Sequence, residues 1–88
     1  MGQNFPNPFN PQTTLRLGVA HVGRMRVTIF SPSGQLIRTL ADGNFSPGTY
    51  RLSWDGADAR GNPVASGIYF VRASSGREVV TRKVTLLR

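Results

Sequence analysis

The chain is predicted to fold as an all-β sandwich or barrel, because its apolar residues alternate with period two and clusters of turn residues separate the alternating runs. About six such runs occur, and helical periodicity is weak throughout. At 88 residues the chain has the length of one domain. A domain of this size buries only about 60–65% of the surface that its unfolded form exposes, so we expect a thin core.

The first half of the chain contains three of the expected strands. Residues 13–20 and 24–30 each carry three apolar side chains on one face. Residues 31–34 have proline second and glycine fourth, which is typical of a type I turn and predicts a hairpin. In the returning run, residues 35–41, the three residues Leu36, Ile37 and Leu40 do not share one face, so we expect a β-bulge. Residues 42–48 are then expected to form a loop that carries Phe45.

Three further strands are expected at residues 49–54, 66–73 and 79–87. In the first of them Tyr50, Leu52 and Trp54 share one face, which favours packing of both rings in the core. Residues 74–76 are expected to join the last two strands as a hairpin. Because the last run extends almost to Arg88, we expect the C-terminal end to be part of a sheet.

Charge indicates polyanions as partners in general, but no particular class. The formal net charge is +7, from 11 basic and 4 acidic residues. The basic residues are dispersed, only Arg82 and Lys83 are adjacent in the second half of the chain, and no nucleic-acid-binding motif is present. We therefore do not expect nucleic acid as a partner, and we expect most of these cations to lie on the solvated faces of strands.

Several classes of protein are excluded by what the sequence lacks. It has no cysteine, so disulfides and thiolate metal sites are excluded. No apolar run approaches the roughly 18–20 residues that span a bilayer, and the beginning lacks the apolar region of a secretory signal. Met1 and Gly2 are expected to be a start added before a fragment of a larger protein.

The densest polar segment, residues 54–61, was compared with three kinds of ligand site. An EF-hand loop beginning at Asp55 would need oxygen donors where Ala57 and Ala59 stand. A phosphate-binding loop would need lysine directly after Gly61, where the chain has asparagine. A cation shared by Asp55 and Asp58, or a pair of catalytic acids, stays possible, but carboxylates in such turns more often accept hydrogen bonds from the backbone. Either carboxylate is a candidate partner for the neighbouring arginine at position 60.

No catalytic apparatus is predicted. His21 is the only histidine, it falls in an expected connection, and no Asp or Glu lies near it in the sequence. There is no cysteine nucleophile and no Gly-x-Ser-x-Gly elbow. Tyr50, Trp54, Tyr69 and Phe70 would form a sugar-stacking platform in a carbohydrate-binding module, but the alternation favours a core position. We therefore predict a protein that is not an enzyme and needs no cofactor.

The aromatic pattern narrows the fold to an immunoglobulin-like β-sandwich of about six to seven antiparallel strands. Tyr69 precedes Val71 by two residues, which matches the corner tyrosine of such sandwiches. Trp54 is expected to lie between the two sheets, and Gly61 and Gly67 to permit turns that a β-carbon would hinder.

Residues 4–11, Asn-Phe-Pro-Asn-Pro-Phe-Asn-Pro, suit neither a helix nor an interior strand. We expect residues 3–12 to be a stiff, extended lead-in that places Phe5 and Phe9 on the folded domain. The predicted organisation is thus an added start at residues 1–2, the lead-in at residues 3–12 and the sandwich at residues 13–88.

Taken together, these motifs resemble the C-terminal sorting domains of type IX secretion, within a broad group that shares an immunoglobulin-like fold with the flagellar hook-capping protein. The resemblance covers residues 3–88, includes the closing segment from Arg82 onward, and is carried by Phe5, Pro6, Pro8, Phe9, Trp54, Asp55, Gly56, Asp58, Gly61, Gly67 and Tyr69.

The resemblance implies a non-catalytic module that directs an upstream cargo protein across the outer membrane to the cell surface. Its implied partners are the outer-membrane translocon, a sortase and anionic lipopolysaccharide. Translocon recognition is implied for the closing strand, formed by Lys83, Val84, Thr85, Leu86, Leu87 and Arg88. The alternatives are a structural immunoglobulin-like domain of the hook-capping kind, which mediates subunit contacts, and a carbohydrate-binding module.

Overall fold

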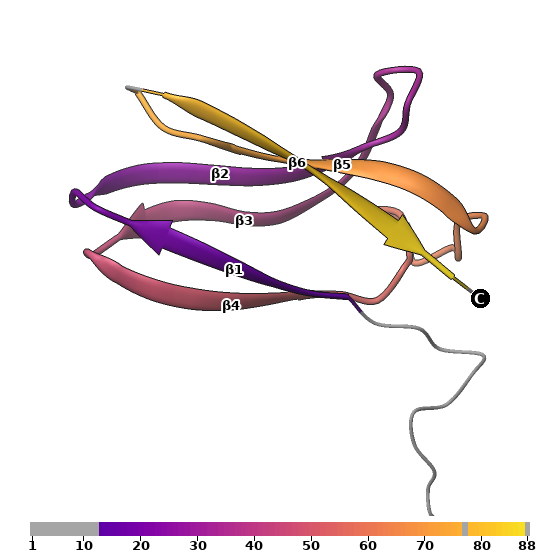
Figure 1. The fold of residues 1–88 in the computed structure, drawn as a ribbon, viewed down its shortest axis with the longest axis horizontal. Coiled ribbons are helices and arrows are strands. Elements are labelled where there is room, and N and C mark those ends of the chain that lie inside the picture. The colour runs from indigo at the N-terminus through magenta and orange to yellow at the C-terminus, as the bar shows by residue number, and fades with distance from the viewer. Residues whose placement is uncertain (1–12, 77, 88) are drawn as a thin grey trace, which may run out of the picture.

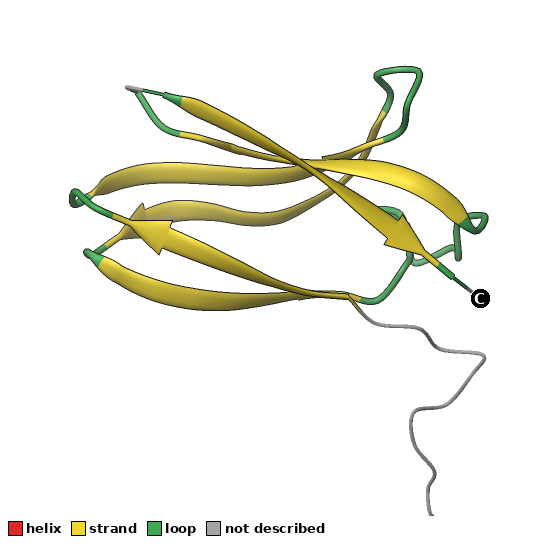
Figure 2. Cartoon of the chain, viewed as in Figure 1, coloured by secondary structure: helices red, strands yellow, loops and turns green. Residues whose placement is uncertain are grey.

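The computed structural model describes residues 13–76 and 78–87, which form six β-strands (Figure 1). The strands are β1 (Thr13–Val19), β2 (Gly23–Phe30), β3 (Leu36–Phe45), β4 (Gly48–Trp54), β5 (Gly67–Ser74) and β6 (Val79–Leu86). The rest of this part of the chain consists of turns and loops, without a helix (Figure 2). The all-β prediction is therefore confirmed, with six strands where about six to seven were expected. The described residues contain no helix that could span a membrane.

Two antiparallel sheets of unequal size face each other. One sheet contains β1 and β4, and the other has the order β3-β2-β5-β6 (Figure 1). Strands β1 and β4 pair along their full length, from Thr13 opposite Trp54 to Val19 opposite Gly48. Since residues 1–12 lie outside the described part of the chain, the predicted packing of Phe5 and Phe9 stays a prediction.

The hairpin between β2 and β3 forms where the turn residues predict it. The amide of Gly34 donates a hydrogen bond of 2.9 Å to the carbonyl of Ser31, as the turn requires. The predicted loop at residues 42–48 is wrong, because β3 continues to Phe45 and pairs Asp42 with Arg26. Strand β2 supplies the backbone partners that keep Asp42, Gly43 and Asn44 extended, and this overrides their local turn preference.

Strand β3 contains the irregularity that its broken alternation predicts. The register between β2 and β3 shifts at two places, between Val27 and Thr28 and between Ile29 and Phe30. These shifts leave Leu40 and Ile37 without a partner residue in β2. Both side chains instead pack against the core, which explains why apolar residues of opposite parity occur in one strand.

The core lies between the sheets and is centred on Trp54. The buried cluster consists of Val27, Ile29, Trp54, Tyr69, Val71 and Leu86. The indole ring is fully buried, contacts the Tyr69 ring edge-on at a centroid distance of 5.2 Å, and donates a hydrogen bond of 2.9 Å to the carbonyl of Ala57. Its only polar atom is thus satisfied inside the core, as buried tryptophan requires.

Tyr69 has the geometry of a corner tyrosine. Its hydroxyl donates a hydrogen bond of 2.6 Å to the carbonyl of Ala65, four residues upstream. Tyr50 repeats the arrangement, with its hydroxyl 2.6 Å from the carbonyl of Ser46. Each tyrosine therefore fixes the chain that enters its own strand.

The turn region between β4 and β5 is held by two carboxylates. Asp55 accepts a hydrogen bond from the amide of Ala57 at 3.1 Å, and Asp58 accepts from the amides of Arg60 and Asn62 at 2.9 and 3.0 Å. The expectation that these carboxylates bond the backbone is confirmed. Asp55 forms its ion pair with Arg38 of β3, at 2.7 Å, and not with Arg60.

Candidate interaction groove between the two sheets

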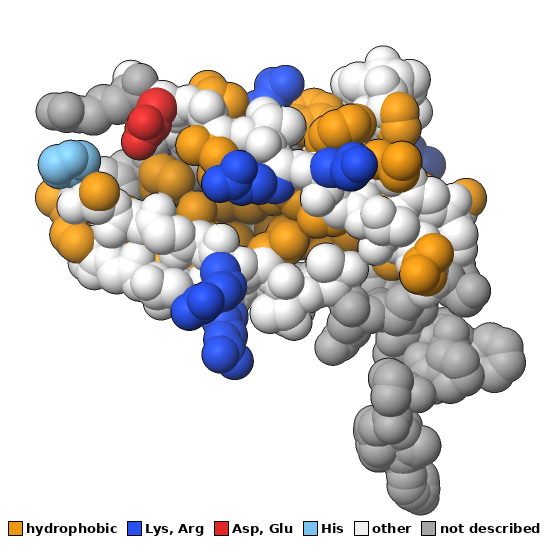
Figure 3. Space-filling model, viewed as in Figure 1, with side chains coloured by type: hydrophobic (Ala, Val, Ile, Leu, Met, Phe, Trp, Pro, Cys, Tyr) orange, Lys and Arg blue, Asp and Glu red, His pale blue; other side chains and the backbone are white. Residues whose placement is uncertain are grey.

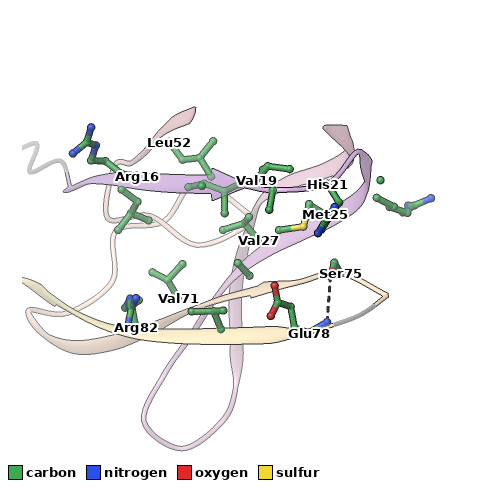
Figure 4. Close-up of a pocket in the computed structure, with 18 of the residues that line it drawn as sticks. Arg16, Val19, His21, Met25, Val27, Leu52, Val71, Ser75, Glu78 and Arg82 are labelled. Carbon is green, nitrogen blue, oxygen red and sulfur yellow. Dashed lines mark hydrogen bonds between the residues drawn. The ribbon is translucent and has the colours of Figure 1, made fainter. Parts of the chain in front are cut away.

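One side of the sandwich is open, because the two sheets do not cover each other completely. A groove of about 740 Å³ runs between β1 and β6, with parts of β2 and β5 at its floor (Figure 4). Strand β6 crosses the view obliquely and lies farther from β1 at its start than at its end (Figure 1). Side chains of β6 are accordingly less buried at its start than at its end: Val80 is 43% exposed, whereas Leu86, on the same face of the strand, is 1% exposed.

Apolar side chains form the interior of the groove. Leu17 and Val19 come from β1, Val27 from β2, Val71 from β5 and Val84 from β6. The space-filling view shows hydrophobic side chains in a crevice between the two layers, with Lys and Arg side chains on both sides (Figure 3). The groove is thus an uncovered extension of the core and not a polar pocket.

The rim of the groove is basic. Arg16 extends from β1 and Arg82 from β6, on opposite walls (Figure 4), and Lys83 follows on β6. Arg16 also lies directly opposite Arg51 in the β1–β4 pair, and like charges in that position repel. The two ion pairs among the described residues are Arg24–Asp42 and Arg38–Asp55, so Arg16, Arg82 and Lys83 have no acidic partner within the described part of the chain.

Two titratable residues lie at the wide end of the groove. His21 comes from the β1–β2 connection and Glu78 from the β5–β6 connection (Figure 4). Among the described residues no hydrogen bond joins the two side chains, and no group of three or more potential metal ligands is found. A nucleophile and its base must lie within hydrogen-bond reach, so these residues do not assemble a catalytic group.

The structure places the predicted site residues in two separate regions. The motif residues Trp54, Asp55, Gly56, Asp58, Gly61, Gly67 and Tyr69 build the core and the turn beside it. Gly56 and Gly61 have φ angles of 76° and 86°, which explains the preference for glycine there. Trp54 is 0% exposed and Tyr69 is 8% exposed, so these two rings pack in the core and are not available as an exposed sugar-stacking platform.

The closing segment divides between core and surface. Leu86 belongs to the buried cluster and Val84 packs against it, whereas Lys83, Thr85 and Leu87 are exposed. Arg88 lies outside the described residues. Two of the six residues predicted for recognition, Val84 and Leu86, therefore contribute to the core.

Arg16 lies on the exposed face of β1, opposite Leu15 and Leu17, as the alternation predicts. Sequence reasoning nevertheless missed the groove and assigned Arg82 to a solvated outer face. One signal was available. Arg82 shares its parity with Val80, Val84 and Leu86, and a cation in the apolar phase of a strand indicates an inner face that is left uncovered. The groove also requires that the two sheets have unequal numbers of strands, and this is not visible in the sequence.

The fold and the groove define an immunoglobulin-like β-sandwich domain with one open side. A family model, described as the FlgD Ig-like domain, matches residues 10–78. The chain therefore belongs to the FlgD Ig-like domain family.

Two solved structures share this fold. FlgD from P. aeruginosa is 19% identical with a TM-score of 0.67, and the match covers 86% of this chain and 58% of that one. FlgD from Xanthomonas campestris, whose structure was described for its insights into the hook capping essential for flagellar assembly, is 22% identical with a TM-score of 0.64 over 85% of this chain and 55% of that one. This chain thus spans somewhat more than half the length of either protein. No curated protein matches it.

These findings overturn the predicted type IX sorting function. The family match and both structural matches lead to FlgD, the hook-capping alternative, so the outer-membrane translocon, the sortase and lipopolysaccharide are withdrawn as partners. The predicted secreted, cell-surface location is wrong for the same reason. Trp54, Gly61 and Tyr69, on which the resemblance depended, build the core and turns of the immunoglobulin-like fold, and such residues do not distinguish between groups that share the fold.

Proposed function

We propose that this chain is a structural immunoglobulin-like domain of the hook-capping kind, which mediates contacts between protein subunits and has no catalytic role. The observation that carries the proposal is the family match over residues 10–78. Hook capping is the process described for the Xanthomonas campestris relative, and in this role the domain would act in flagellar assembly.

The surface of the domain supports a role in protein contacts. Large hydrophobic side chains are exposed at six described positions, and three of them, Val79, Val80 and Leu87, lie on or beside the closing strand. Strands β1 and β6 each pair on one side only, so each presents unpaired backbone groups along its other edge. Free edges and exposed apolar side chains are features that protein partners recognise.

A non-catalytic role agrees with the positions of the polar groups. Asp55 and Asp58 hold a turn, Asp42 pairs with Arg24 on the surface, and the hydroxyl groups of both tyrosines bond to the backbone. These groups are engaged in structure and leave no assembled pair for acid–base or nucleophilic chemistry among the described residues.

We further propose that residues 13–88 act as one domain and that residues 3–12 are its extended lead-in. The strands support the first boundary, since β1 begins at Thr13 and pairs with β4 from that residue onward. Paramagnetic labels attached to the lead-in would test the second boundary through relaxation of nearby amides in the sandwich.

Photocrosslinking in the cells that produce the chain tests the proposed function. A benzophenone amino acid is placed in turn at Val22, Leu36, Ile68 and Val80, all of which are exposed. Irradiation is expected to link at least one position to a subunit of the flagellar hook, identified by mass spectrometry. If a folded, abundant protein forms no adduct with a flagellar subunit at any of the four positions, the proposal is refuted. Unirradiated cells supply the control.

A further inference from the structure

We propose that the groove binds an extended, acidic segment of a partner protein, which adds as a third strand at the free edge of β1. The inference rests on the proposed role in protein contacts and specifies the chemistry of the partner. Backbone hydrogen bonds to β1 would supply affinity, apolar side chains would cover the groove, and acidic side chains would meet the basic rim.

The first argument is the unequal size of the sheets. A two-stranded sheet faces a four-stranded one, and the inner face of β6 is covered only toward its end. Val80 points into the same space as Leu86 but is 43% exposed, against 1% for Leu86. A third strand beside β1 would extend the smaller sheet over Val80 and Val84 and complete the second layer.

The second argument is the accessible edge of β1. This strand pairs with β4 alone, and its residues form one wall of the groove. Seven residues of antiparallel strand extend over about 23 Å, so a segment of seven or eight residues would match β1 in length. Alternate residues of the segment would point inward, toward Leu17 and Val84, and these are expected to be aliphatic.

The third argument is charge. Arg16 on β1 and Arg82 and Lys83 on β6 all border the groove, and Glu78 is the one acid among the described residues that line it (Figure 4). Arg16 is also next to Arg51 across the strand pair. Carboxylates on the outward side of an added strand would lie beside Arg16, where opposite charges in neighbouring strands stabilise the pair. The repulsion between the two arginines would be reduced at the same time.

Two other occupants meet these requirements less well. A second copy of the chain carries the same net charge of +7, so its strands would be repelled by the basic rim. Residues 1–12 of the same chain contain no acid. They also have prolines at positions 6, 8 and 11, so whichever edge of this segment faced β1, at least one backbone donor would be missing. The charge and the free edge therefore favour an acidic segment from another protein.

A peptide with the sequence Val-Asp-Val-Glu-Val-Asp-Val-Glu, blocked at both ends, tests the proposal with the full chain. The control peptide carries Asn and Gln in place of Asp and Glu. A second control has every other amide methylated, so that it cannot donate hydrogen bonds along one edge of the strand. Fluorescence anisotropy is expected to show binding of the acidic peptide that is at least about tenfold tighter than that of either control, the change that 1.4 kcal/mol produces.

Matched variants of the protein locate the site. Arg16→Glu is expected to weaken binding by about tenfold, whereas Arg60→Glu, which changes an exposed cation away from the groove, is expected to change it less than about twofold. Val80→Asp and Ile68→Asp form a second pair, since the two side chains are 43% and 45% exposed but only Val80 lines the groove. Circular dichroism checks that all four variants remain folded.

Hydrogen exchange measured by NMR identifies the edge. On addition of the acidic peptide, amides of β1 that exchange in the free protein are expected to become protected. The proposal is overturned if protection appears only in β6 or nowhere, if the neutral peptide binds equally well, or if the free protein shows contacts between the Phe5 or Phe9 ring and Val80. Crosslinks to flagellar subunits that form at Leu36 or Ile68 but not at Val80 would overturn this inference and leave the proposed function intact.

Discussion

Replacement of Trp54 by alanine should remove a large part of the stability of the domain. The indole is fully buried, contacts Tyr69 edge-on at 5.2 Å and donates a hydrogen bond of 2.9 Å to the carbonyl of Ala57. Truncation of a buried large aromatic costs about 3–5 kcal/mol. Since total stabilities are about 0.05–0.15 kcal/mol per residue, an 88-residue domain has roughly 4–13 kcal/mol to lose.

A second substitution separates the packing of Trp54 from its hydrogen bond. Trp54→Phe keeps an aromatic ring in the core but leaves the carbonyl of Ala57, a residue only 8% exposed, without its donor. An unsatisfied buried group of this kind costs about 1–3 kcal/mol. We therefore expect the free energies of unfolding to rank as wild type, then Trp54→Phe, then Trp54→Ala.

Urea unfolding followed by far-ultraviolet circular dichroism measures these differences, because both variants remove the only tryptophan and its fluorescence. With a slope of about 1–2 kcal/mol per molar urea, Trp54→Ala should lower the midpoint by at least about 1.5 M. Ile68→Ala is the control: its side chain is 45% exposed, so the expected loss is below about 1 kcal/mol. Equal midpoints for Trp54→Ala and Ile68→Ala would refute the central position of the indole in the core.

Three further substitutions test separate features. Tyr69→Phe deletes the hydroxyl that bonds the backbone at 2.6 Å and should cost about 1 kcal/mol in urea unfolding; an unchanged midpoint would contradict the role of the corner tyrosine. Gly61→Ala should cost about 1–2 kcal/mol because its φ is 86°, while Gly43→Ala, where a β-carbon meets open space, should be neutral or stabilising, and calorimetry distinguishes the two. Asp42→Asn removes the ion pair with Arg24, in which the Arg24 side chain is 75% exposed and the Asp42 side chain 37% exposed. The free energy of unfolding should change by less than about 0.5 kcal/mol, and a larger loss would show a stronger pair than this exposure implies.

The sequence predicted correctly those strands and turns that depend on neighbouring residues alone. Alternation of apolar residues identified the strand regions, and proline and glycine in residues 31–34 identified the β2–β3 turn. Asp42, Gly43 and Asn44 misled the prediction because their turn preference is overcome by pairing with β2, in which the partner of Asp42 is Arg26, 16 residues earlier in the chain (42 − 26). Pairing across such a distance is not encoded in the segment itself.

The groove could be predicted only in part. Its basic residues and its apolar floor are visible in the sequence, and Arg82 in the apolar phase of the last strand indicates an uncovered face. The open side itself results from the assignment of two strands to one sheet and four to the other. That assignment depends on which edges meet in three dimensions, so no short motif reports it.

The irregular edge at β3 limits how copies of the domain can associate. The extra residues Ile37 and Leu40 disturb its pairing, and the amide of Ala59 donates a hydrogen bond of 3.0 Å to the carbonyl of Ile37, so a neighbouring loop already occupies part of this edge. Open-ended fibres grow head to tail and need two complementary surfaces on every subunit. Because part of this edge is occupied, pairing of β6 in one copy with β3 of a second copy would be incomplete, which disfavours open-ended stacking through the larger sheet.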